Sequence, residues 1–342
     1  MKNIAVFIDG TGQDRSKQEL SDVTNVGRLH DACKGLSSAG VFQKVKYCNG
    51  VGTGVHERFS GGAFGIGLDK RIIEGYLFLQ QEVGLARAKN EPYKIFIFGF
   101  SRGAFAARWL AEVIEFSGIP LMGKSERPGI MNLWNRDSEN ARKLRECGDQ
   151  YDANVEMIGV WDTVQTTLTS DFGVKTIPVN AASAFHAMAL DEFRVKFQVT
   201  RFAADNRVQE VWFDGCHADV GGGYENGRKT ADAALVWMAD RAREHGLLID
   251  CDKLDLGRQK EERPEIHDEL AGRGCLCFVW RFTNWIRRIK RNVRPVLAGD
   301  ILHDTVQVWK QKYAINHLQN LDSCRIWGDL GIDRIGTLYG LG

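Results

Sequence analysis

The sequence has few prolines, no long apolar run and no excess of charge of either sign. Six prolines in 342 residues argue against long disordered linkers. No stretch approaches the roughly 18–20 apolar residues that cross a bilayer, and the N-terminal run meets Asp9 too soon for a signal peptide. The net charge of +1 gives the chain as a whole no attraction to nucleic acid or membrane. We therefore expect a protein that is cytoplasmic at synthesis, for which a leaderless export route would leave no trace in the sequence.

The cysteines also lack the spacing of a metal or redox site. None of the eight forms a CxxC pair, and the one close pair, Cys275 and Cys277, is a weak metal signal. In a chain made in the cytoplasm we expect all eight to be reduced and structural. The sequence therefore predicts neither a metal nor a cofactor.

Short apolar runs alternate with amphipathic segments over the first 250 residues. Apolar runs of this length are typical of parallel strands covered on both faces. Strands are expected at 3–8, 44–48, 94–100, 155–161 and 211–213, and helices at about 24–34, 68–89, 103–116 and 230–245. This alternation predicts an α/β fold with a mostly parallel, doubly covered sheet.

The length allows one large α/β domain with insertions, or two small domains. We assign residues 1–250 to one α/β domain, in which the polar stretch 119–154 is a candidate cap insertion. Residues 251–342 are charged and less periodic, which indicates a helical C-terminal appendage or cap rather than sheet core. The glycine-rich stretch 50–67 lacks the ending of a phosphate-binding loop, and we interpret it as an active-site loop.

Residues 99–103, Gly-Phe-Ser-Arg-Gly, match the G-x-S-x-G pattern of a nucleophile elbow. In that turn a serine between strand and helix exposes its hydroxyl, and the flanking glycines let neighbouring elements pass close by. The bare pattern is common, but here an apolar strand precedes it and an alanine-rich helix follows. We therefore predict Ser101 as a nucleophile; the alternative is an ordinary strand–helix turn with glycines for packing.

A nucleophilic serine of this kind works with donors that stabilise an oxyanion. The backbone N–H of Arg102, at the start of the following helix, is the expected first donor. The second is expected from the loop after a neighbouring strand, where Thr11 or Gly12 is our candidate. The alternative is that residues 9–12 form only a turn.

The serine also needs a base, which comes last in the chain order serine, acid, histidine. His217 follows an apolar strand end and precedes a run of glycines, on a loop that can approach the serine closely. His30 and His56 precede the serine, His186 lies on a predicted helix, and His245 follows a charged helix. The remaining histidines lie in the polar C-terminal part of the chain: His267, His303 and His317. We predict His217 as the base; the alternative is a structural loop histidine.

Asp162 ends the apolar run 155–161 and lies between the serine and the histidine in the chain. We predict it as the carboxylate that orients His217. Asp214 and Asp219 are rivals, but each lies on the histidine's own loop. There, an Asx-type hydrogen bond that holds the loop is the simpler role.

Six motifs in one order resemble those of a known family. They lie at 7–12, 49–54, 99–104, 159–164, 186–192 and 211–224. Together they span about residues 3–245. They resemble the α/β-hydrolase family of uncharacterised bacterial proteins that includes the phospholipase effectors of type VI secretion, first lipase class. The resemblance implies an α/β-hydrolase-like fold, a triad of Ser101, Asp162 and His217, and release of fatty acid from phospholipids.

We therefore expect a serine hydrolase that cleaves carboxylic esters through an acyl-enzyme, with a phospholipase or lipase favoured. Its expected partner is phospholipid or another ester substrate. Two alternatives stay open. One is a carboxylesterase or acyl-transfer enzyme that acts on soluble esters, and the other is a non-catalytic module that keeps the fold to bind a partner.

Residues 275–299 contain six basic residues, four aromatic residues and no acid. A basic aromatic helix is typical of a surface that contacts anionic lipid, which would make the protein peripheral to a membrane. The alternative is a solvated helix that packs its aromatic face on the domain. Arginine-mediated nucleic-acid binding is a third interpretation, although no nucleic acid is expected from the chain as a whole.

Overall fold

The computed structural model describes most of the first 254 residues and short parts of the rest. The described residues are 1–10, 23–38, 40–50, 63–120, 150–151, 153–165, 175–224, 228–254, 256, 267, 293–304, 306 and 324–326.

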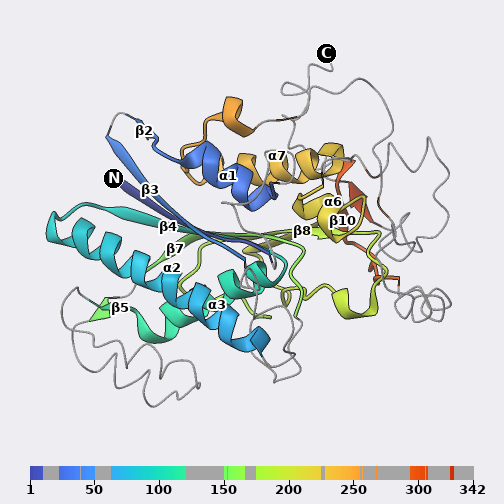
Figure 1. The fold of residues 1–342 in the computed structure, drawn as a ribbon, viewed down its shortest axis with the longest axis horizontal. Coiled ribbons are helices and arrows are strands. Elements are labelled where there is room, and N and C mark those ends of the chain that lie inside the picture. The colour runs from blue at the N-terminus through green and yellow to red at the C-terminus, as the bar shows by residue number, and fades with distance from the viewer. Residues whose placement is uncertain are drawn as a thin grey trace.

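Within these ranges the chain forms a nine-stranded sheet of order β11-β10-β9-β8-β7-β4-β1-β3-β2 (Figure 1). Its strands are β1 (Lys2–Ile8), β2 (Ser37–Ser38), β3 (Val41–Cys48), β4 (Tyr93–Phe100), β7 (Val155–Trp161), β8 (Ala184–Ala189), β9 (Val208–Phe213), β10 (Ile301–Leu302) and β11 (Arg325–Ile326). All neighbours are parallel except β2 and β3. A separate antiparallel pair joins β5 (Ile119–Pro120) to β6 (Gln150–Tyr151).

Helices cover both faces of the sheet (Figure 1). One face carries α2 (Ala63–Ala88) and α3 (Arg102–Ser117), and the other carries α1 (Asn25–Cys33) and α7 (Arg228–Glu244). The short helix α6 (His217–Gly221) follows β9, and two 3-10 turns lie at Val195–Phe197 and Cys251–Leu254. None of the helices in the described ranges is long and apolar enough to span a bilayer.

The central strands are buried along nearly their whole length, as strands covered on both faces should be. In β1, Ile4, Val6 and Ile8 pack in the layer of α2 and α3. Ala5 and Phe7 point the other way, into the layer of α1 and α7. The fold is therefore a mostly parallel, doubly covered α/β sheet of the α/β-hydrolase type, as the alternation of the sequence predicts.

Two interpretations of the sequence need correction here. The segment that contains His186 was expected to be helical, but residues 184–189 form β8, buried between β7 and β9. Burial in the sheet overrides the weak helical preference of its alanines and methionine. The helix expected at 68–89 begins earlier, at Ala63, so the end of the glycine-rich stretch 50–67 is helical rather than loop.

The part of the chain after residue 250 was expected to lie outside the sheet, yet it supplies β10 and β11. Ile301 and Leu302 pair in parallel with Val211 and Trp212 of β9, which extends the sheet at that edge. Strands of two residues are too short to show a period of two in sequence, so the pattern did not reveal them. The domain boundary at residue 250 and the cap insertion at 119–154 remain predictions, and most of 119–154 lies outside the described residues.

Candidate active site

The carboxyl ends of three strands bring the three predicted site residues together. Ser101 follows β4, Asp162 follows β7 and His217 follows β9 by way of a short turn. These strands are parallel and lie in the same part of the sheet, so their carboxyl ends meet at one edge. That edge is where ligands bind in open α/β sheets.

Ser101 occupies the sharp turn between β4 and α3. Its backbone has φ 59° and ψ −124°, a conformation that residues with a side chain rarely adopt. The turn is held in place because the Ser101 N–H donates to the carbonyl of Trp161 at 3.0 Å, and the Ser101 carbonyl accepts from Ala104 at 3.1 Å. The neighbouring strand and the first turn of α3 thus fix the serine at the sheet edge.

The two glycines of the elbow allow a close approach that no side chain would permit. A Cβ at Gly99 would lie 2.4 Å from the carbonyl oxygen of Gly103, and one at Gly103 would lie 2.2 Å from that of Ile8. The start of α3 therefore packs directly on the ends of β4 and β1. This confirms the expectation that the glycines let neighbouring elements pass close by.

His217 is the first residue of the short helix α6, whereas the glycines that follow it predicted a loop. Its Nε2 lies 2.7 Å from the Ser101 hydroxyl oxygen. The ring packs between the aromatic rings of Phe100 and Phe197, with centroids 4.7 Å and 5.0 Å away. Two aromatic side chains therefore contact the histidine ring, and one ring nitrogen is directed at the serine.

Asp162 lies just past the end of β7 and is fully buried. Its backbone also adopts a positive φ, 40°. Its Oδ2 lies 2.5 Å from Nδ1 of His217, and its Oδ1 accepts the N–H of Ala189 at 3.0 Å. The chain of contacts from the serine through the histidine to the aspartate is thus complete.

The two rival carboxylates have other environments. Asp219 accepts the N–H of Cys216 at 3.0 Å and caps α6, the kind of loop-holding role expected of it. Asp214 is buried, and its Oδ2 has no hydrogen-bond partner among the described residues. Burial, reinforced by the charge of Asp191, raises the pKa of Asp214 to about 7. The carboxylate in contact with the His217 ring is Asp162.

Arg294 is a site residue that the sequence analysis missed. Its two terminal nitrogens donate to the two carboxylate oxygens of Asp162, at 2.6 and 2.9 Å. Burial by itself would raise the pKa of Asp162, but the charge of Arg294 and the hydrogen bond with His217 outweigh it and hold that pKa well below its usual range. The carboxylate therefore stays ionised despite being buried.

Arg294 also corrects the interpretation of residues 275–299. It was counted among the basic residues of a lipid-facing surface, but the residue is 1% exposed and its guanidinium is bound to protein oxygens. A buried ion pair between residues so far apart in the chain leaves no periodic signal, and so the pattern of charges misassigned it. Residues 275–292 lie outside the described residues, and their contact with lipid stays a prediction.

His186 forms a second buried histidine–carboxylate pair, but its other ring nitrogen meets the backbone. Nδ1 lies 2.9 Å from Glu210, and Nε2 accepts the N–H of Thr163 at 3.1 Å. Burial lowers the pKa of His186 in spite of Glu210, which suits a neutral ring that donates from Nδ1 and accepts at Nε2. This pair supports the backbone beside Asp162.

The predicted oxyanion donors are described only in part. Arg102 is the first residue of α3, so its N–H lies at the helix N-terminus beside Ser101. Thr11 and Gly12 lie outside the described residues, and their role stays a prediction. Just before them, Asp9 accepts the N–H of Gly10 at 2.6 Å and the hydroxyl of Thr24 at 2.6 Å, which fixes the start of that turn.

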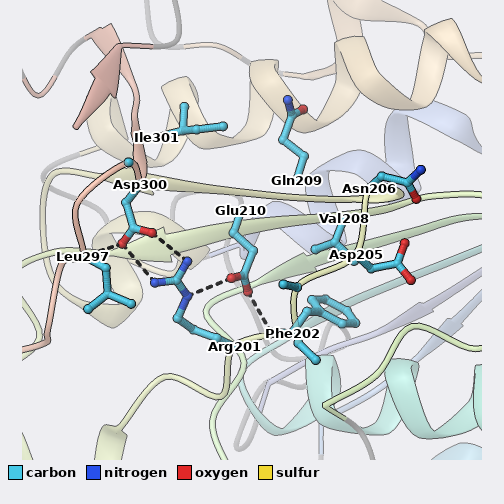
Figure 2. A pocket seen from close by; sticks show the side chains of 13 residues that line it. Arg201, Phe202, Asp205, Asn206, Val208, Gln209, Glu210, Leu297, Asp300 and Ile301 are labelled. Atoms are coloured by element: carbon cyan, nitrogen blue, oxygen red, sulfur yellow. Dashed lines mark hydrogen bonds and ion pairs between the residues drawn. The ribbon is translucent and has the colours of Figure 1, made fainter. Parts of the chain in front are cut away.

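A surface pocket of about 800 Å³ lies beside β9 and is lined by residues of the ranges 201–210 and 297–301 (Figure 2). Arg201 lies between Asp300 and Glu210 in its wall and bonds to both. Ser101, Asp162 and His217 do not line it. In the described part of the chain, no group of three or more histidine, cysteine, aspartate or glutamate residues is placed to hold a metal ion.

The fold and this constellation together define the class of the protein as α/β-hydrolase-like. Residues 2–241 match the model of a family described as "T6SS, Phospholipase effector Tle1-like, catalytic domain". The chain belongs to this family, which confirms the resemblance found in its six motifs.

Individual relatives are more distant. The chain is 26% identical over 228 residues to the uncharacterized protein YEL023C of Saccharomyces cerevisiae, covering 58% of this chain and 32% of that protein. Among solved structures, it is similar to the Tle1 effector bound to the VgrG spike of the Type 6 secretion system, with 21% identity and a TM-score of 0.41. That match covers 65% of this chain and 51% of the effector.

A second solved structure, of an uncharacterized protein from Pseudomonas aeruginosa, is 18% identical with a TM-score of 0.42. The match covers 73% of this chain and 46% of that protein. The chain thus spans about a third of the yeast protein's length and about half of each solved chain.

Proposed function

We propose that this protein is a serine hydrolase that cleaves carboxylic esters of phospholipids and releases fatty acid through an acyl-enzyme. One observation carries the proposal: Ser101, His217 and Asp162 form an unbroken chain of contacts of 2.7 and 2.5 Å at the carboxyl edge of the sheet. A nucleophile in contact with a base, which is oriented by a carboxylate, is the arrangement that activates a serine.

In the first half of the reaction, the Ser101 oxygen attacks the ester carbonyl carbon. Its proton passes to Nε2 of His217, and the buried, ionised Asp162 stabilises the imidazolium at Nδ1. The tetrahedral intermediate then collapses, and the bond to the leaving alcohol breaks. The alcohol oxygen takes the proton from Nε2, and the acyl group stays on Ser101.

In the second half, water replaces the alcohol. Nε2 of His217 takes a proton from water as the water oxygen attacks the acyl carbon, and the same proton returns to the Ser101 oxygen as the ester bond breaks. Fatty acid leaves and the serine is restored. The N–H of Arg102 is the proposed first donor to the oxyanion in both halves, and such a donor contributes about 3–4 kcal/mol of transition-state stabilisation in serine hydrolases.

The substrate class is supported by family membership, since the matching family is described as a phospholipase effector domain. A short-chain soluble ester would be attacked by the same chemistry, so the substrate must be tested separately from the nucleophile. A non-catalytic binding module would keep the fold without needing the contact between Ser101 and His217.

The nucleophile is tested by labelling with a fluorophosphonate and mapping the adduct by mass spectrometry. We expect one adduct on Ser101, and hydrolysis of p-nitrophenyl butyrate that falls by about three orders of magnitude or more in Ser101→Ala. Thermal unfolding of Ser101→Ala should resemble that of the wild type, because only a hydroxyl is removed. An adduct on another residue, or retained hydrolysis in the variant, would contradict the assignment; a folded protein that neither reacts nor hydrolyses would favour the binding module.

A further inference from the structure

Arg294 lies beyond the 2–241 match to the family, yet it holds the carboxylate of the proposed triad. Its first terminal nitrogen donates at 2.6 Å both to Asp162 and to the carbonyl of Ala189. Its second donates to Asp162 at 2.9 Å and to the carbonyl of Phe197 at 2.6 Å. The side chain therefore joins the aspartate to the backbone at Ala189 and at Phe197, and the ring of Phe197 packs against His217.

We propose that Arg294 is a positioning residue of the catalytic site, which fixes and charges Asp162 so that the aspartate can orient His217. A guanidinium fork that bonds both carboxylate oxygens fixes the plane of the carboxylate as well as its position. Oδ2 can then meet Nδ1 of His217 in one direction only. A lysine would supply the charge without the fork.

The position of Arg294 depends on how its segment is anchored to the sheet. Six residues further on, Asp300 bonds Arg201 through both oxygens at 2.9 Å (Figure 2). Asp300 also accepts from the indole N–H of Trp212 at 3.0 Å. Val296 and Leu302 are buried in a cluster that includes Trp212. These contacts fix the segment from Arg294 to Leu302 on the sheet, and they hold Arg294 beside Asp162.

The charge of Arg294 has an effect that geometry alone would not have. The charge of Arg294 is the largest of the influences that lower the pKa of Asp162, so substituting Arg294 should let Asp162 take up a proton at higher pH, where it no longer orients His217. Other ionisable groups near the pair are Glu192, which accepts the N–H of His217 and bonds Arg194, and also Asp191, Asp214 and His186. None of these is changed by substituting Arg294, so the shift can be assigned to it.

The test compares Arg294→Met and Arg294→Lys with Arg207→Met in the full chain. Arg207 is a matched control because it also bonds an aspartate and several carbonyls, but at the opposite, amino-terminal end of β8 and β9. The readout is the rate of fluorophosphonate labelling of Ser101 against pH. We expect a loss of about 100-fold in Arg294→Met, with the acid limb moved up by about one pH unit.

Arg294→Lys keeps the charge and should lose about tenfold in rate with its acid limb in place, because only the fork is removed. If Arg294→Met does not fold, the labelling rate of Arg294→Lys tests the positioning role. Arg207→Met should keep the wild-type rate and profile. Wild-type rates and profiles in both Arg294 variants would overturn the inference.

The inference rests on the proposed function, because the labelling rates measure the reactivity of Ser101. A second measurement therefore uses a property of the His217–Asp162 contact that does not depend on that reactivity. In ¹⁵N-histidine-labelled protein, the Nδ1 proton shared by His217 and Asp162 should give a far-downfield resonance. We expect it to move or to vanish by exchange in Arg294→Met and to persist in Arg207→Met. If the wild type proves unreactive but this resonance responds, the proposed function fails and the positioning role stands; an unchanged resonance overturns the positioning role.

Discussion

At the scale of single residues, Asp162 shows what a sequence can and cannot predict about a site. Chain order and a preceding apolar run predicted Asp162 as the carboxylate beside His217, and the two side chains are in contact because the carboxyl ends of parallel strands meet at one edge. Arg294 could not be found in this way. It lies 132 residues further on, and its contact depends on the path by which the chain returns to the sheet.

Asp214 gives a prediction about stability, because it is a buried carboxyl with a pKa raised to about 7 by burial and then by Asp191. Its pKa in the unfolded chain is about 4, so the folded state holds the extra proton between these values. The stabilisation is fully present below about pH 4 and is lost as pH rises through about 7. The free energy of unfolding of Asp214→Asn should therefore exceed that of the wild type by about 1–2 kcal/mol at pH 8, with little gain at pH 4.

The control for this experiment is Asp205, a surface carboxyl whose pKa the side-chain hydrogen bond of Arg207 lowers to about 2. Asp205→Asn should gain no stability at pH 8, since its charged form is the favoured one. Calorimetry of both variants from pH 4 to pH 8 checks the prediction. An Asp214→Asn variant that is less stable than the wild type at pH 8 would show that the charged form of Asp214 is needed in the fold.

At the scale of elements, the elbow was predictable and its surroundings were less so. Strand 94–100 and the following helix were placed to within about one residue, because an apolar run and an alanine-rich run are strong signals. Strand β8 was taken for a helix because Ala184–Ala189 has little β-branched content, and only its position between two strands makes it extended. The strands β10 and β11 were not predicted, because two residues are too few to show the pattern of a strand.

The elbow also allows a prediction about packing. A Cβ at Gly103 would lie 2.2 and 2.5 Å from the backbone oxygens of Ile8 and Asp9, which cannot move without breaking the end of β1. A Cβ at Gly75 of α2 would meet only the side chains of Leu110 and Val6, at 3.0 and 3.1 Å. We expect Gly103→Ala to cost about 3 kcal/mol or more of the free energy of unfolding.

Gly75→Ala should stay within about 1 kcal/mol of the wild type, because the two side chains can shift slightly and alanine favours a helix. Urea unfolding midpoints of the two variants check this difference. Equal midpoints would show that α3 can move away from β1 and that the elbow is not packed as tightly as the distances imply.

At the scale of the whole molecule, the site is assembled from more of the chain than the family match covers. Asp162 bonds Arg294, and Asp219 bonds both the backbone and the ring of His267, at 2.9 and 2.6 Å. Both partners come from the region expected to be an appendage. Residues on the two sides of the predicted division at residue 250 therefore contact one another at the candidate site.

Hydrolysis of phospholipid esters through Ser101 is tested by incubating the full chain and Ser101→Ala with vesicles of mixed bacterial phospholipids and identifying the products by mass spectrometry. We expect free fatty acid and lysolipid from the wild type, and at least about a thousandfold less from the variant. Products from both proteins, or none from a folded wild type that is labelled at Ser101, would contradict the proposed function; the second result would leave soluble esters as the substrates.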